Sequence, residues 1–296
     1  MIMKSELKIL VLGATGLLGS SLGLRLKESY PNVICHGHTN MTDVNLDLMV
    51  AGNVSSLLSE LNPDVVVNLI GLTSVERCQD ESNLAYLLNT KIVEDIVLWV
   101  NTFKPTTYLV QISTDQVYDG QGPHPENDVT LTNIYALTKY AAEISAKQVD
   151  SAILRTNFVG KSKVKSRESL TDWVYSAVSG NQEVFVLDDI FFSPLSINTL
   201  IEIISEVIEK RPLGVFNVGS TDGMSKADFD FLFANLLAMP VENMKKIKSH
   251  QATFLRAYRP KDMRMNCDLI QSVLGIKLPK LADEIKKVSY EYDTNS

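Results

Sequence analysis

Tyr135 and Lys139 lie four positions apart in the stretch Tyr-Ala-Leu-Thr-Lys. On a helix, residues four apart share one face, so the phenol and the ammonium group can come close together. Free tyrosine has a pKa of about 10, and a neighbouring positive charge lowers that pKa because it favours the phenolate. Such a tyrosine can act as a general acid toward a carbonyl or as a general base toward an alcohol. A solvated surface pair is the alternative, since this spacing is common by chance.

A glycine motif near the start of the chain predicts a dinucleotide site. Gly13, Gly16 and Gly19 follow an apolar run at residues 8–12 and precede a helical pattern. Gly13 permits a tight turn, Gly16 lets the backbone approach a pyrophosphate, and Gly19 allows the helix to pack closely on the strand. The helix N-terminus then offers N–H groups to the phosphates. The alternative is a glycine-rich turn without a ligand.

Hydroxyl groups follow another apolar run, at residues 107–113. Ser113 and Thr114 end this run, ahead of Asp115. Ligands of open α/β sheets bind beyond the carboxyl ends of the strands. A hydroxyl group there can donate a hydrogen bond to a substrate carbonyl and polarise it. A hydroxyl that only caps a turn is the alternative.

The elements that must position these groups alternate along the chain. Continuous apolar runs predict strands at residues 8–12, 33–35, 64–70, 107–113, 152–155 and 214–218, and helical spacing predicts helices after residue 16 and at 94–103, 134–147 and 200–208. Such runs are typical of strands buried on both faces of a parallel sheet. We therefore expect an α/β fold, a Rossmann-type doubly wound parallel sheet with a smaller C-terminal substrate-binding lobe. Residues 1–156 and 193–221 are expected to form the dinucleotide-binding domain, and residues 157–192 and 222–296 the substrate-binding lobe.

Composition narrows the classes of function. A length of 296 residues suggests about two domains. The net charge of −7 argues against a broad nucleic-acid surface. Cys35, Cys78 and Cys267 lie far apart, which excludes a cysteine zinc site or a disulfide scaffold and indicates a reducing compartment. No signal peptide pattern occurs, and no apolar run reaches the ~18 residues of a membrane span. We expect a soluble, cytoplasmic protein with neither a nucleic-acid nor a membrane partner.

The choice of cofactor depends on the segment after the second predicted strand. Residues 36–40 read His-Gly-His-Thr-Asn and contain no carboxylate. A carboxylate there would bind the ribose hydroxyls of NAD and repel the 2′-phosphate of NADP, so its absence favours NADPH. No arginine marks that phosphate, and NADH stays open. Asp47 is a candidate contact to adenine, with a helix cap or loop carboxylate as the alternative.

Several other polar and aromatic residues are candidates for a functional site. The four histidines lack metal-ligand spacing apart from His36 and His38, and Asp188 and Asp189 are expected to cap or to be solvated, so no metal site is predicted. Residues 161–168 form either a solvated loop or a loop over an anionic substrate. Trp173 and Tyr175, on an apolar helix, are expected in the core or at an interface.

The glycine motif, the Ser-Thr-Asp stretch and the Tyr-Lys pair together resemble the extended short-chain dehydrogenase/reductases, which act largely on nucleotide sugars. Among these, the chain is most similar to the dTDP-4-dehydrorhamnose reductases. The similarity covers nearly the whole length and continues through residues 68–78, 113–120, 135–143, 153–156 and 259–266.

The resemblance implies an NAD(P)-dependent oxidoreductase. A hydride passes from the nicotinamide C4 to the C4 ketone of a nucleotide-activated 4-keto-6-deoxy sugar, and the product feeds a surface polysaccharide. Tyr135 protonates the oxygen, Thr114 binds it, and Lys139 holds the nicotinamide ribose and lowers the tyrosine pKa. The implied cofactor contacts are Gly13, Thr15, Gly16, Leu17, Leu18, Gly19, His38, Asp47, Leu48, Gly71, Leu72, Thr73, Tyr135 and Lys139.

The same resemblance implies substrate contacts at Ser113, Asp115, Val117 and Phe158, with Arg259 on the nucleotide's phosphates. Related 4,6-dehydratases carry an Asp-Glu pair where this chain has Asp115 and Gln116, which argues against a dehydratase. An epimerase or a reductase acting at another carbon remains an alternative. So does a non-catalytic regulatory subunit, because the resemblance extends to the β-subunit of methionine adenosyltransferase. A homodimer is expected only from the frequency of two-fold oligomers.

Overall fold

The structure is a computed structural model that describes residues 4–38 and 42–293. The chain divides into two compact units. The first comprises Met1–Thr114, Asn133–Arg155 and Ile201–Phe216, and the second comprises Asp115–Thr132, Thr156–Leu200 and Asn217–Ser296. The cofactor and substrate roles expected for the two domains stay predictions.

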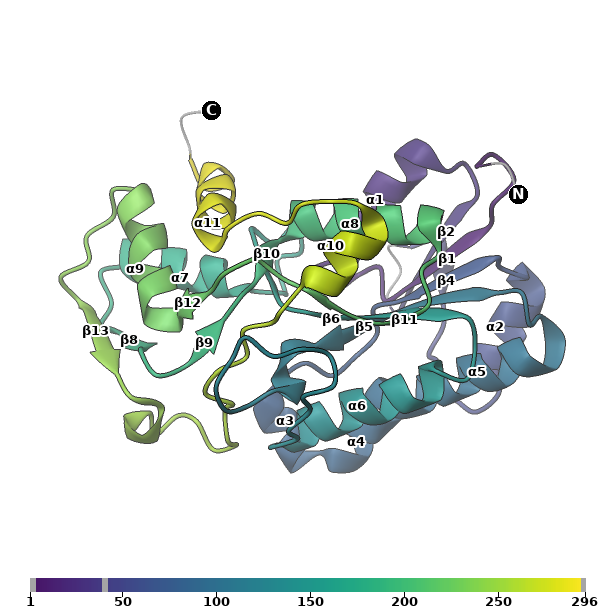
Figure 1. Cartoon of the computed structure of the whole chain (residues 1–296), viewed down its shortest axis with the longest axis horizontal. Helices are drawn as coiled ribbons and strands as arrows, with labels where there is room; N and C mark the ends of the chain where they lie inside the picture. The colour runs from purple at the N-terminus through teal and green to yellow at the C-terminus, as the bar shows by residue number, and fades with distance from the viewer. Residues whose placement is uncertain (1–3, 39–41, 294–296) are drawn as a thin grey trace. The chain divides into compact units, whose positions relative to one another are not determined.

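A seven-stranded sheet forms the centre of the first unit (Figure 1). Its strands stand in the order β11-β6-β5-β4-β1-β2-β3, which is the strand order of doubly wound dinucleotide-binding folds. Apolar residues face each other across it, as where Leu10 lies between Ile34 and Val66 in parallel register. The strands are β1 (Ile9–Leu12), β2 (Val33–Gly37), β3 (Val44–Asn45), β4 (Val65–Asn68), β5 (Tyr108–Thr114), β6 (Ser151–Thr156) and β11 (Gly214–Val218). The expected parallel α/β sheet is confirmed.

Helices cover both faces of this sheet. On one face lie α2 (Asn53–Leu61), α5 (Ile92–Phe103) and α6 (Ile134–Ala146), while α1 (Gly19–Ser29) covers the other (Figure 1). The short helices α3 (Val75–Asp80) and α4 (Ser82–Tyr86) lead into a π-helical turn, η1 (Leu87–Lys91), ahead of α5. Apolar side chains of α2, α5 and α6 pack on Leu10, Val66 and Leu109 of the strands. This packing holds the loops at the carboxyl ends of the strands in place.

The second unit has its own apolar core. Its helices are α7 (Leu170–Ser179), α9 (Lys226–Leu236), α10 (Asp268–Leu274) and α11 (Leu281–Tyr290), with 3-10 turns η2 (Asp115–Val117) and η3 (Ser249–Gln251). Short strands pair two by two: β7 (Phe158–Val159) with β10 (Leu195–Ser196), β8 (Val184–Leu187) with β13 (Met244–Ile247), and β9 (Phe191–Phe192) with β12 (Met224–Ser225). Phe192, Phe229 and Phe233 are at the centre of this core.

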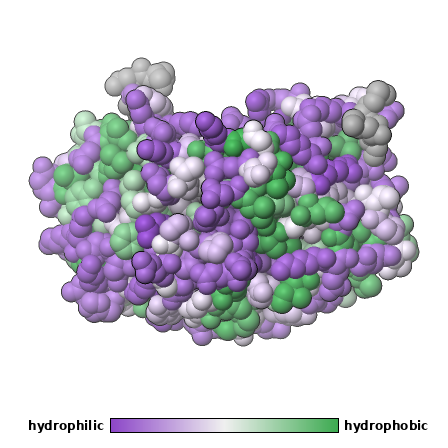
Figure 2. Space-filling view, in the orientation of Figure 1, coloured by the Kyte–Doolittle hydropathy of each residue, from purple (hydrophilic) through white to green (hydrophobic). Residues whose placement is uncertain are grey.

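The element boundaries differ from the expected ones where a polar contact decides them. Helix α8 (Ile197–Lys210) begins three residues before the expected start at residue 200. The hydroxyl of Ser196 accepts a hydrogen bond from the backbone N–H of Thr199 and so caps the first turn, an interaction that apolar periodicity does not reveal. The face drawn in Figure 2 is mostly polar, with apolar residues in smaller groups. Within residues 4–38 and 42–293, no helix is long and apolar enough to cross a membrane.

Candidate active site

The glycine motif forms a tight turn between β1 and α1. Gly13 has a positive φ of 81°, and its N–H and that of Ala14 both donate to the carbonyl of His36. A β-carbon on Gly19 would lie 2.4 Å from the Gly13 carbonyl oxygen and 2.7 Å from the Ala14 α-carbon. Glycine is therefore required at both positions for the turn and for the close approach of helix and strand.

The start of α1 fits a bound phosphate group. Leu18 occupies the N-cap position without a side-chain hydrogen bond, and the first turn has no acidic residue. The helix dipole and the first N–H groups therefore meet no competing carboxylate from this helix. Gly16 has no side chain to cover the backbone, and among the described residues beyond its chain neighbours, the one atom within 4 Å of a β-carbon placed there is the Gly13 carbonyl oxygen, at 3.3 Å. These features fit the pyrophosphate of a dinucleotide.

The residues at the end of β2 and beyond it, where adenosine contacts are expected, differ in their environments. His36 is buried, and its Nε2 lies 2.9 Å from the carbonyl oxygen of Leu46, while His38 is exposed. Asp47 accepts a hydrogen bond from the N–H of Met49, as a carboxylate that stabilises its own loop does. Leu48 is buried in the core. A packing role is thus favoured for Leu48. Thr39 and Asn40 lie outside the described residues, and the cofactor preference stays a prediction.

Asn89 organises the loop that follows β4, and sequence reasoning missed it. Its Oδ1 accepts from the N–H of Leu72 at 2.7 Å, and its Nδ2 donates to the carbonyl of Leu72 and to the hydroxyl of Thr138. A β-carbon on Gly71 would lie 3.0 Å from Asn89 Oδ1 and 3.8 Å from Lys139 Nζ. One buried amide therefore links the Gly71–Leu72 backbone to α6, while Thr73 is exposed.

Ser113 and Thr114 end β5, as expected, but they differ in environment. Ser113 donates its hydroxyl hydrogen bond to Glu143, a completely buried carboxylate that also receives both Nε and Nη2 of Arg155. This contact gives Ser113 a structural role, and the substrate contact expected at Ser113 stays a prediction. Thr114 is one residue farther along and is also buried.

Tyr135 and Lys139 lie one turn apart on α6, which Asn133 caps through the N–H of Ala136. Their residual exposures of 8% and 5% rule out the solvated surface pair. Lys139 Nζ donates to the carbonyl of Ile112 at 2.6 Å, two residues before Thr114. Burial lowers the pKa of Lys139 to about 8, and the negative charge of Glu143 opposes that shift. The ammonium group thus stays charged at neutral pH in a site nearly closed to water.

The expected substrate residues of the second unit have different settings. Asp115 is buried and accepts from Nδ2 of Asn157 at 2.8 Å, and the neighbouring Phe158 is half-buried on β7. Val117 is completely buried, and its carbonyl accepts from the N–H of Thr130. The Val117 side chain therefore packs in the interior, and the substrate contact expected at Val117 stays a prediction.

Arg259 lies in a segment that folds against the one after Thr114. Asp119 accepts hydrogen bonds from the hydroxyl of Tyr258 and from the N–H of Lys261, on either side of Arg259. Arg259 is half-buried, and its Nη1 donates to the carbonyl of Ala257. The second unit therefore brings together Asp119 and the segment around Arg259, which the sequence separates by about 140 residues.

The other candidate residues predicted from the sequence take part in capping, loop anchoring or surface packing. The carboxylate of Asp189 accepts from the N–H and hydroxyl of Ser249, which is the capping role expected. Backbone N–H groups of Lys161 and Ser162 donate to Glu291 and Asp172, which anchors the start of the charged loop. Trp173 is exposed, so it is not a core residue. Among the described residues, no group of His, Cys, Asp and Glu could hold a metal ion.

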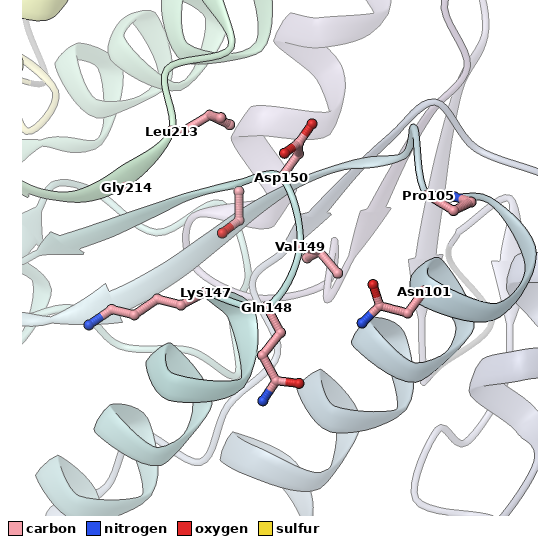
Figure 3. A pocket seen from close by; sticks show the side chains of 9 residues that line it. Asn101, Pro105, Lys147, Gln148, Val149, Asp150, Leu213 and Gly214 are labelled. Carbon is pink, nitrogen blue, oxygen red and sulfur yellow. The ribbon is translucent and has the colours of Figure 1, made fainter.

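A cavity of about 430 Å³ lies in the first unit, away from these groups (Figure 3). Ser151 and Gly214, the first residues of β6 and β11, line it together with Asn101, Lys147 and Asp150. It therefore lies at the amino ends of the strands, whereas Gly13, Gly71 and Thr114 all lie at carboxyl ends. Ligands of such sheets bind at the carboxyl edge, so this cavity is not the candidate active site.

Comparison with known proteins decides the family. The model of the RmlD substrate binding domain matches residues 7–294. The chain belongs to this family. Within the curated relatives, the RmlD-family chain is 26% identical to dTDP-4-dehydrorhamnose reductase of Shigella flexneri, over 98% of this chain and 99% of that protein. It is 30% identical to the spore coat polysaccharide biosynthesis protein SpsK of Bacillus subtilis, over 75% of this chain and 76% of that one.

A solved structure agrees on the fold of the RmlD-family chain. The dTDP-4-dehydrorhamnose reductase of Bacillus anthracis, solved in complex with NADP, superposes with a TM-score of 0.86 at 23% identity. The match covers 96% of this chain and 99% of that one. The expected fold of the extended short-chain dehydrogenase/reductases is therefore confirmed.

Proposed function

We propose that this protein is an NADPH-dependent reductase of a nucleotide-activated 4-keto-6-deoxy sugar, of the dTDP-4-dehydrorhamnose reductase type. The observation that carries the proposal is the arrangement of Thr114, Tyr135 and Lys139, all buried in the unit that holds the bare glycine turn. Full-length similarity to dTDP-4-dehydrorhamnose reductases supports the choice of substrate class. The complex of the Bacillus anthracis protein supports NADP as the cofactor.

In this proposal, the turn at Gly13, Gly16 and Gly19 and the N-terminus of α1 hold the pyrophosphate of the cofactor. The backbone at Gly71 and Leu72, which Asn89 orients, flanks the nicotinamide half. Lys139 binds the nicotinamide ribose. When bound, the nicotinamide cofactor supplies the hydride for the ketone carbon of the sugar.

The protein's own residues bind the ketone oxygen and supply its proton. The hydroxyl of Thr114 donates a hydrogen bond to the ketone oxygen and stabilises the negative charge that develops there. Tyr135 transfers its phenolic proton to that oxygen, which yields the alcohol. The positive charge of Lys139, one turn away on α6, stabilises the phenolate that remains and makes this transfer easier. Exclusion of water from the buried pair strengthens both electrostatic effects.

Residues of the second unit bind the rest of the substrate in this proposal. Arg259 offers a guanidinium group to the phosphates of the nucleotide, and Asp115 and Phe158 contact the sugar. We propose a cytoplasmic location as well, which the three buried free cysteines support. The expected homodimer stays a prediction.

Oxidation of NADPH and NADH against a panel of nucleotide-activated 4-keto-6-deoxy sugars tests the proposal. We expect turnover of one sugar by the unmodified protein. The Tyr135→Phe variant should bind NADPH with nearly unchanged affinity but lose roughly 10²- to 10⁴-fold in kcat. Tyr290→Phe, at an exposed tyrosine of α11, is the matched control and should retain full activity.

The opposite results would point elsewhere. Full activity of Tyr135→Phe would remove the tyrosine from the chemistry. Tight NADPH binding without turnover of any sugar would contradict the reductase and favour a regulatory subunit, which co-purification with a second polypeptide would then reveal.

A further inference from the structure

Asp230 is a buried carboxyl that the mechanism above does not use. It lies on α9 among Ala227, Phe229 and Phe233, and 2% of its surface is exposed. Its Oδ1 has no hydrogen-bond partner among the described residues. A buried oxygen left in this state destabilises the fold, and native proteins keep few of them. A polar group from outside the chain, either a water molecule or a ligand, would supply the missing hydrogen bond.

Lys226 lies one helical turn before Asp230, yet the two charges do not meet. Within the described residues, they form neither a hydrogen bond nor an ion pair, although they share one face of α9. The ammonium group of Lys226 lies 5.7 Å from the centre of the Phe192 ring. An oppositely charged pair at this spacing usually closes on a surface helix. Here each group keeps its hydrogen-bonding capacity.

The groups around this pair are those expected at the substrate. Lys226 interacts electrostatically with Asp115 and Asp230, which stabilise its charge, and with Arg259, which opposes it. Asn157 holds the carboxylate of Asp115 at 2.8 Å. Asp115 follows Thr114, Asn157 precedes Phe158, and Arg259 is the expected phosphate ligand. All five residues belong to the second unit, so its own fold assembles them.

Burial also determines the charges that this cluster offers. It raises the pKa of Asp230 to about 8, against the opposing effect of Lys226, and it lowers the pKa of Lys226. Near neutral pH the carboxyl of Asp230 is therefore largely protonated, and it both donates and accepts hydrogen bonds. A protonated carboxyl next to an ammonium group suits neutral hydroxyl groups, because a hydroxyl both donates and accepts hydrogen bonds, as this pair does.

We propose that Lys226 and Asp230 form a subsite for the hydroxyl groups of the substrate's sugar and thereby determine which sugar is accepted. The proposal rests on the proposed function, and it names the part of the substrate that these two residues recognise. Asp230 accepts a hydrogen bond from one hydroxyl through Oδ1, and Lys226 donates to the oxygen of a neighbouring one. Arg259 remains with the phosphates.

Steady-state kinetics with Asp230→Leu and Lys226→Met test the proposal. The substrates are the nucleotide-activated 4-keto-6-deoxy sugar turned over by the unmodified protein and analogues that lack the C2 or the C3 hydroxyl. We expect each variant to lower kcat/KM for the complete sugar by about tenfold to a hundredfold. The unmodified protein should discriminate against one analogue by a similar factor, and the variants should discriminate much less. Affinity for NADPH should not change.

Asp228→Asn is the matched control on the same helix. Asp228 is exposed, accepts from Ser225 and Lys246, and lies outside the cluster. We expect this variant to lose some thermal stability and no activity. Asp230→Leu should do the reverse, with an equal or higher Tm and a lower kcat/KM, because it removes a buried polar group whose Oδ1 has no hydrogen-bond partner among the described residues.

Two results would overturn the proposal. One is a lower Tm for Asp230→Leu with unchanged kcat/KM, which would mark a structural residue. The other is equal discrimination among the analogues by the variants and the unmodified protein. Failure of the proposed function is distinct, because the unmodified protein would then turn over none of the sugars. In that case, calorimetric titration of the same sugars into both variants and the unmodified protein decides whether this cluster binds them.

Discussion

The Glu143 carboxylate and the Arg155 guanidinium form a two-pronged ion pair that is completely buried between α6 and β6. Arg155 Nη2 lies 2.6 Å from Glu143 Oε2, and Arg155 Nε lies 2.9 Å from Glu143 Oε1. Ser113 adds a third donor from the end of β5. Since Thr114 follows Ser113 and Lys139 lies one turn before Glu143, this pair holds the two parts of the candidate active site in register.

Removal of one charge from this pair should destabilise the protein strongly. Glu143→Gln leaves the Arg155 charge buried without compensation, and we expect a loss of about 3–5 kcal/mol in the free energy of unfolding. The double variant Glu143→Gln with Arg155→Met should recover much of that loss, since it buries no unpaired charge. Urea denaturation measures both. Additive losses in the double variant would contradict this account of the pair.

Gly16 and Gly19 should respond differently to alanine. A methyl group on Gly19 collides with the backbone of Gly13 and Ala14, so Gly19→Ala should lose about 1–3 kcal/mol of stability as well as NADPH binding. A methyl group on Gly16 has a contact of 3.3 Å, so Gly16→Ala should fold and still bind NADPH at least about tenfold more weakly. Thermal denaturation and fluorescence titration separate the two effects. Normal NADPH affinity of Gly16→Ala would show that no phosphate approaches this turn.

The rate should fall at alkaline pH because Lys139 loses its proton. Burial places the pKa of this lysine at about 8, so the ammonium group that supports Tyr135 is present below that pH and disappears above it. We expect kcat to decline as the pH rises through about 8. A lysine of ordinary pKa, with a rate that is constant until about pH 10, would be the contrary result.

Asn89→Ala should weaken the loop after β4. The substitution leaves the buried N–H of Leu72 without its partner and the carbonyl of Leu72 with the Cys78 thiol alone, at a cost of about 1–3 kcal/mol. We also expect weaker NADPH binding, because Gly71 and Leu72 lose their orientation. Asn101→Ala, at an exposed position of α5, is the control and should change neither property. Equal effects of the two substitutions would remove Asn89 from the site.

Asp230 predicts a pH dependence of stability. Its pKa is about 8 in the folded protein and 3.8 as the ordinary value, so the folded state retains a proton that the unfolded state releases. Stability that depends on this proton is present below about pH 4 and is lost as the pH rises toward 8. Lys226, Asp115 and Arg259 face this cluster and are the charges that modify the effect. Urea denaturation of Asp230→Asn should show a weaker decline over this interval than the unmodified protein, and parallel curves would contradict the assignment.

Much of the fold is encoded by local pattern. The runs at β1, β4 and β5 are largely apolar because these strands are buried on both faces, and this predicts a parallel sheet. The parallel sheet in turn places Gly13 and Thr114 at one edge, where the strands end. Spacing alone places Tyr135 and Lys139 on one face of α6. These inferences need only the periodicity of helices and strands.

The residues missed from sequence act through long-range contacts. Asn89 lies within a run of helical residues and has no motif around it. The π-helical turn at Leu87–Lys91 also changes the side of the helix on which Asn89 lies, so regular helical spacing does not predict its position. The residues next to Asp230 in the sequence do not indicate that its carboxyl is buried without a hydrogen-bond partner on Oδ1. Arg155 did carry a signal, since a charged residue at the end of a buried strand requires a carboxylate. Glu143, one turn after Lys139, is that carboxylate.

The division of the chain into interleaved segments has a consequence for its synthesis. Residues up to Thr114 contain strands β1 to β5, so five neighbouring strands of the sheet are available on the ribosome before any part of the second unit exists. Strands β6 and β11 are added only after loops that belong to the other unit have been made. Since neither unit is one continuous piece of sequence, a single chain break or stop codon cannot release either of them intact. Truncated products should therefore be targets for degradation rather than independent domains.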